Sequence, residues 1–210
     1  ALLARAQLSL HDNDESFTRT IALLRRAAAV AVAARVDESA AEAMVHLLYL
    51  RGRSPGQAAR ELEDLELLAA HVARLPSPGP LRGLLLNNAA VVALARGEPA
   101  EARRLLAEAL AVKRAAGVPR VELAYTRSNL AMLEEDPAVR SHEMRQVVEI
   151  FDEDLGAAHP TTIEGRMTAS LYVREPEVAR DLVRPGCEAL ARFSSGERHL
   201  LARCLALLAH

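Results

Sequence analysis

The chain alternates between segments with helically spaced apolar residues and short clusters of turn-forming residues. In the clearest segment, one face combines the apolar positions of a helical i, i+3, i+4, i+7 pattern, namely Leu86, Ala89, Ala90 and the run 91–93. The turn Gly97-Glu98-Pro99 ends this segment, because glycine favours a helix C-terminus and proline a helix start. A second apolar stripe follows the turn and contains Ala102, Leu105, Leu106, Ala109 and Leu110. Since the turn is short, the two predicted helices must fold back against each other.

The turn clusters recur along the whole chain, with short and long breaks in alternation. This spacing predicts helix pairs that repeat at roughly 40 residues, within the range of helical-repeat arrays. We expect one domain over 1–210, with pairs near 1–36, 37–78, 80–118, 120–157 and 160–195 and a terminal helix at 199–210. In the last pair, Pro185-Gly186 is expected to kink or split the second helix, because proline removes a backbone donor.

The composition favours an all-α fold. Half of the residues are apolar, but only 3% are aromatic. The dominant residues are Ala, Leu, Arg and Glu, which favour helices, while β-branched and aromatic strand formers are scarce. Small alanine side chains let helices approach closely, so this composition suits thin repeated layers better than one bulky core.

The best-formed pair resembles the tetratricopeptide repeat (TPR). That repeat has a small residue at its eighth position and alanine at its twentieth and twenty-seventh positions. With Gly97 at the fifteenth position, these places are taken by Ala90, Ala102 and Ala109. The chain departs from the usual pattern at the fourth and eleventh positions, where Leu86 and Ala93 replace the common aromatic residues.

Two further strings resemble the kinesin-light-chain type of this repeat. The string 86–90 reads LNNAA and is similar to the LNNLA of that subfamily, and Asn129-Leu130-Ala131 recurs 41 residues later. The string 155–162 reads LGAAHPTT and resembles the subfamily's LGxxHPxT linker. The resemblance implies a right-handed α-α superhelix, or solenoid, of about five TPR-like helix-turn-helix pairs plus a terminal helix.

The resemblance also implies a binding surface. In such arrays the first helices of successive pairs line a concave groove, which recognises a peptide or protein segment. Asn88 and Asn129 fall on a position that touches the backbone of the bound chain in this subfamily. The residues expected to share the groove are Asn87, Val91, Tyr125, Ser128 and Met132, with His46 and Tyr49 extending it. The alternative interpretation is that the asparagines bond neighbouring helices and hold the spacing of the stack.

Motifs that carry chemistry are scarce. His142-Glu143 begins like a zinc-protease helix, but Gln146 stands where the second histidine is needed. The set Cys187, His199, Cys204 and His210 matches no zinc spacing, so no metal site and no cofactor are expected. The net charge of -2 and the lack of a basic stripe disfavour nucleic acid binding. No run approaches the 20 or so apolar residues that span a membrane. We therefore expect an interaction module rather than an enzyme.

The chain is expected to be a fragment of a longer protein, because it starts inside an apparent helix and without methionine. Its Ala-Arg-Leu-rich style resembles the C-terminal arrays of bacterial, particularly myxobacterial-type, serine/threonine protein kinases. It also resembles the sensor arrays of ATP-dependent transcription regulators, so a kinase or ATPase domain would lie outside this sequence. Two cysteines cannot make a disulfide framework, which favours a reducing, cytoplasmic location. The competing hypotheses are a small-ligand-sensing domain and a self-associating array that dimerises through its terminal helix.

Overall fold

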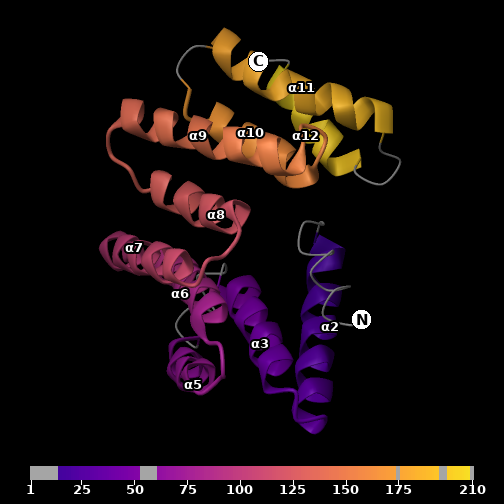
Figure 1. Cartoon of the computed structure of the whole chain (residues 1–210). Helices are drawn as coiled ribbons and strands as arrows, with labels where there is room; N and C mark the ends of the chain where they lie inside the picture. The colour runs from indigo at the N-terminus through magenta and orange to yellow at the C-terminus, as the bar shows by residue number, and fades with distance from the viewer. Residues whose placement is uncertain (1–13, 53–60, 174–175, 194–197, 209–210) are drawn as a thin grey trace. The chain divides into compact units, whose positions relative to one another are not determined.

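A computed structural model describes residues 14–52, 61–173, 176–193 and 198–208 (Figure 1). Within these ranges the regular elements are ten α-helices, and no strand is present. Their bounds are α2 (Asp14–Ala33), α3 (Asp37–Gly52), α5 (Glu61–Ala73), α6 (Gly79–Ala95), α7 (Pro99–Ala115), α8 (Arg120–Ala131), α9 (Pro137–Leu155), α10 (Pro160–Ser170), α11 (Pro176–Phe193) and α12 (Arg198–Leu208). The expected all-α fold is confirmed, while residues 1–13 of the pair expected near 1–36 lie outside the described residues.

The helices group into two compact units, 1–118 and 119–210. In the first unit, α3 packs against α2, α5 and α6, and α6 packs against α7. In the second unit, α8 packs against α9, α9 against α10, α10 against α11 and α11 against α12. The expectation of one continuous domain over the whole chain stays a prediction.

The pair α6 and α7 shows why small residues mark the repeat. Ala90, Ala102 and Ala109 are fully buried, at 0% exposure each. A Cβ atom on Gly83 of α6 would lie 2.4 Å from Cγ of Lys113 on α7, so this position admits only glycine without rearrangement. Gly97 has φ +78°, and the amide of Glu98 donates to the carbonyl of Ala93 at 2.9 Å. The tight turn predicted from the sequence therefore forms.

The core of the first unit lies on both sides of α3. One cluster joins α3, α5 and α6 through Val45, Leu48, Val72 and Leu85. A second cluster joins α2 and α3 through Leu24, Ala27, Ala28 and Leu47. Because α3 contributes to both clusters, it is the central helix of this unit, as Figure 1 also shows.

In the second unit, local signals place the ends of α9 and α10. Asp136 caps α9 by accepting hydrogen bonds from the amides of Ala138 at 2.8 Å and Val139 at 3.4 Å. Gly156 ends α9 with φ +88°, a conformation that favours glycine. His159 Nδ1 accepts from the amide of Thr161 at 3.2 Å, and Pro160 begins α10. The LGAAHPTT string thus acts as a helix-to-helix linker.

Two sequence expectations about the C-terminal helices fail. First, α11 continues through Pro185 without a break, so Pro185 does not split it, while the alternative expectation of a kink stays a prediction. Pro185 and Asp181, the residue whose carbonyl loses its usual donor, are both exposed, so water can solvate that carbonyl. Second, Cys187 and Cys204 form a disulfide that joins α11 to α12, whereas the sequence favoured reduced cysteines. α12 therefore has a partner helix.

No helix in the described ranges is both long enough and apolar enough to cross a membrane. The same residues contain no group of three or more His, Cys, Asp or Glu side chains that could hold a metal ion.

Candidate functional site

The predicted groove begins where α3 and α6, the first helices of two successive predicted pairs, lie in contact. Asn88 Nδ2 on α6 donates to the backbone carbonyl of Val45 on α3 at 3.0 Å. Asn87 Nδ2 donates to Asn88 Oδ1 at 3.2 Å, and the two side chains are only 7% and 3% exposed. The Asn88 amide therefore ties the two helices together, which is the stacking role that the sequence left open beside binding.

The other predicted residues of the first unit are partly exposed. His46 and Tyr49 on α3 and Val91 on α6 are half-buried. His46 and Tyr49 are three positions apart and so share one face of α3, while Asn87 and Val91 are four apart and share a face of α6. Tyr49 also packs against the cluster between α2 and α3. His46, Tyr49 and Val91 therefore keep part of their surface accessible on the two helices that the Asn88–Val45 bond joins.

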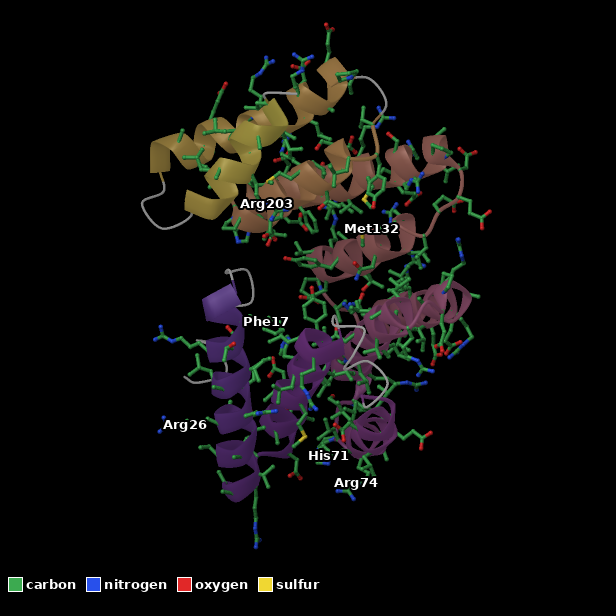
Figure 2. The ribbon with its side chains drawn as sticks, turned by 180° about the vertical axis from the view of Figure 1, so that it is seen from behind. Phe17, Arg26, His71, Arg74, Met132 and Arg203 are labelled. Atoms are coloured by element: carbon green, nitrogen blue, oxygen red, sulfur yellow. A yellow bond between two sulfur atoms is a disulfide. The ribbon has the colours of Figure 1, made fainter. Side chains whose placement is uncertain are left out.

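The predicted residues of the second unit also contribute to packing. Tyr125 exchanges a 2.7 Å hydrogen bond with Thr161 of α10, and its ring lies 5.1 Å from that of Phe151 on α9. Ser128 Oγ donates to Met144 Sδ at 3.7 Å. Met132, labelled in Figure 2, packs against the cluster around Met144 and Ala131. Asn129 is half-buried and interacts within the chain. All four side chains are partly exposed, so they combine packing with accessible surface.

A feature that the sequence analysis missed is an apolar cleft of about 270 Å³ between α3 and α5. Asp64 and Arg51 form an ion pair at 3.6 Å among its lining residues, and Nε2 of His71 is buried without a hydrogen-bond partner. The cleft is lined by Met44, Leu47, Leu48, Arg51, Asp64, Leu67, Leu68 and His71. Both helices contribute residues at i, i+3, i+4 and i+7, a spacing that in a sequence looks like an ordinary core stripe.

The ionisable groups whose pKa is shifted lie in ion pairs on exposed helix surfaces. A hydrogen bond from Arg104 lowers the pKa of Glu101, and the pKa of Arg104 is raised by its contacts with Glu101 and Glu108. On α8, hydrogen bonding to Glu153 is the main cause that raises the pKa of Arg120, together with the charge of Asp154. These shifts arise from solvated charge pairs, and none involves a residue of the predicted groove.

The architecture defines this protein as a TPR-like helical-repeat solenoid. A crystal structure of BtubC (BKLC) from P. vanneervenii is similar to it with a TM-score of 0.72 and 15% identity, over 93% of this chain and 82% of that chain. A putative kinesin light chain from Podosopora anserina with nearly identical TPR-like repeats is similar with a TM-score of 0.51 and 21% identity, over 99% and 93% of the two chains. No protein-family model matches the sequence, and no curated protein matches it. At these identities the similarity establishes the fold alone.

Removing the amide of Asn88 should weaken the contact between α3 and α6. In Asn88→Ala, the carbonyl of Val45 loses a buried donor and Asn87 loses its acceptor, so we expect the first unit to lose about 1–3 kcal/mol of unfolding free energy. Urea unfolding followed by circular dichroism measures this loss. Arg82→Ala on the same helix is the control, because it removes only an exposed ion pair and should change stability by less than about 1 kcal/mol. Equal stability of the two variants would contradict the stacking role.

Proposed function

We propose that the chain is a protein-interaction module that binds a peptide or protein segment against the first helices of its pairs. Solenoids of TPR-like pairs present such helices as an extended surface, and the two similar structures are consistent with an interaction or scaffold role. We further propose that it serves as a scaffold or regulatory part of a larger signalling protein, on the resemblance to bacterial kinase arrays described above.

The observation that carries the proposal is the pairing of α3 and α6 by Asn88. The bond fixes two first helices side by side, so the half-buried His46, Tyr49 and Val91 keep a defined spacing. The Asn88 amide is already hydrogen-bonded to the carbonyl of Val45, so a bound segment would contact the neighbouring side chains instead. A preorganised face of this kind lowers the entropy cost of binding an extended segment.

A peptide-display selection against the chain tests this function. Peptides retained by the chain should bind Val91→Glu at least roughly tenfold more weakly, because a charge at the face must be desolvated on binding. Val139→Glu is the matched control, since Val139 is 45% exposed and lies on α9, the second helix of its pair. Affinities by fluorescence anisotropy that are equal for Val91→Glu and the wild-type chain would place the binding surface elsewhere.

The cleft between α3 and α5 favours a second candidate function, the sensing of a small ligand. Its walls are mostly apolar, and His71, whose Nε2 is buried without a hydrogen-bond partner, is one of the lining residues. However, 270 Å³ lies just below the range of about 300–1,000 Å³ that is usual for ligand pockets, which makes it the weaker candidate. A thermal-shift screen of the chain with a set of peptides and a set of metabolites separates the two functions. His71→Ala should abolish stabilisation by a metabolite only if the cleft is the binding site.

Self-association through α12 is supported by one observation, the 55% exposure of Leu205 on that helix. Light scattering at two protein concentrations, with Leu205→Glu as the test variant, distinguishes a homodimer from a monomer. A mass independent of both concentration and substitution would remove this alternative.

A further inference from the structure

The last two helices are joined covalently at one point. Cys187 on α11 and Cys204 on α12 are 17 positions apart, their Cα atoms are 5.5 Å apart, and their sulfur atoms are bonded. The residues are 4% and 0% exposed, so the bond lies inside the contact between the helices. Neither the predicted binding face nor the α3–α5 cleft contains either cysteine.

Apart from this bond, α12 has a modest hold on the second unit. It has 11 residues, and isolated helices shorter than about 12–15 residues are marginal in water. Leu201, Leu207 and Leu208 are only half-buried against the cluster that contains Ile163, Met167, Val183 and Leu190. The opposite face of α12, with Ala202, Leu205 and Ala206, is exposed. In the part of α12 whose side chains the structure describes, 201–208, the contacts with the second unit are therefore these partial ones and the bridge.

We infer that the Cys187–Cys204 pair is a redox latch that controls whether α12 covers the apolar cluster at the C-terminal end of the second unit. With the bridge formed, α12 is tethered on α11. When a dithiol transfers two electrons and two protons to the bridge, the S–S bond breaks, two cysteine thiols form, and the dithiol becomes a disulfide. The freed helix then opens and uncovers the surface formed by α10 and α11.

The burial of both sulfur atoms shapes the kinetics of the latch. A thiolate must reach a sulfur atom to attack it, and both cysteines are covered while α12 is docked. Reduction therefore requires a prior opening of α12, and low urea, which favours this opening, should speed reduction. In the loop-entropy account, a bridge that closes a loop of this length shifts the equilibrium between docked and undocked α12 toward the docked form by roughly 100-fold. Loss of the bridge should therefore raise the undocked population of α12 by up to that factor.

Hydrogen–deuterium exchange of the full chain, followed by mass spectrometry, tests the latch. After dithiothreitol treatment, confirmed by a mass gain of two hydrogen atoms, the amides of α12 should exchange roughly 10–100-fold faster than in the bridged protein. The α6 and α7 amides of the first unit serve as an internal reference and should keep their protection. Cys204→Ser should exchange like the reduced protein with or without dithiothreitol, whereas Ala206→Ser, an exposed change on the same helix, should respond as the wild type does.

Two results would overturn the inference. One is a reduced chain whose α12 amides keep the protection of the bridged chain, because the leucine contacts alone would then hold the helix. The other is a purified chain that retains two free thiols after treatment with oxidised glutathione in low urea, because the pair would then not form the bridge.

Discussion

Replacing Phe151 with alanine should lower the unfolding free energy of the second unit by about 3–5 kcal/mol, the usual cost of truncating a buried phenylalanine. Phe151 on α9 is 2% exposed, and its ring lies 5.1 Å from that of Tyr125 on α8. It also lies against Gly165 of α10, where a Cβ atom would be 2.9 Å from Cδ2 of the ring. One side chain thus fills the junction of three helices, and the neighbours cannot close the space without moving those helices.

Urea unfolding, with hydrogen–deuterium exchange used to follow the second unit separately, measures this loss of unfolding free energy. The bond from Thr162 Oγ1 to the carbonyl of Phe151 should survive the substitution, because it uses only the main chain of that residue. Leu171→Ala is the matched control: this side chain is 67% exposed, so its truncation should cost less than about 0.5 kcal/mol. If Phe151→Ala were as mild as Leu171→Ala, the junction would not be the core of the unit.

Arg166→Ala should cost the second unit about 2–4 kcal/mol, because Arg166 joins three helices through charged contacts. From α10, its guanidinium pairs with Asp152 of α9, and its Nη1 donates to the carbonyl of Leu182 on α11 at 3.0 Å. The Arg166 side chain is 12% exposed and that of Asp152 is 31% exposed. Truncation would leave a partly buried carboxylate without its cation, and the exposure of Asp152 keeps the cost below that of a fully buried pair.

A double variant separates the part of this stability loss that comes from the unpaired charge from the part that comes from lost side-chain packing. Arg166→Met combined with Asp152→Leu removes both charges and keeps apolar volume, so it should recover at least half of the stability that Arg166→Ala loses. The control is Arg184→Ala, which breaks an ion pair with Asp181 whose side chains are 57% and 69% exposed, and should change stability by less than about 1 kcal/mol. Equal losses in Arg184→Ala and Arg166→Ala would refute the bridging role of Arg166.

The repeat itself could be read from the sequence because its signals are local. Gly97 ends a helix whatever surrounds it, and Ala90, Ala102 and Ala109 mark positions where two backbones approach. The linker around Gly156 and Pro160 likewise acts on its own neighbours along the chain. For these elements, periodicity and turn chemistry contain the necessary information.

The remaining features depend on contacts that no local pattern specifies. The spacing of Cys187 and Cys204 does not show that α12 folds back to place their Cα atoms 5.5 Å apart. Asn88 lies where the resemblance predicts, but only the approach of α3 brings a carbonyl within reach of its amide. The continuity of α11 through Pro185 depends on which side of that helix faces water. Each outcome is decided by a neighbouring helix or by solvent.

The tie from Asn88 to the main chain of Val45 has a consequence for how such arrays diversify. A side chain that grips a carbonyl oxygen is indifferent to the identity of the residue that owns it. Adjacent units can therefore stay in register while their apolar residues are exchanged, provided that volume is respected. A helical array of this design tolerates wide drift of its consensus, aromatic positions included, without loss of its spacing.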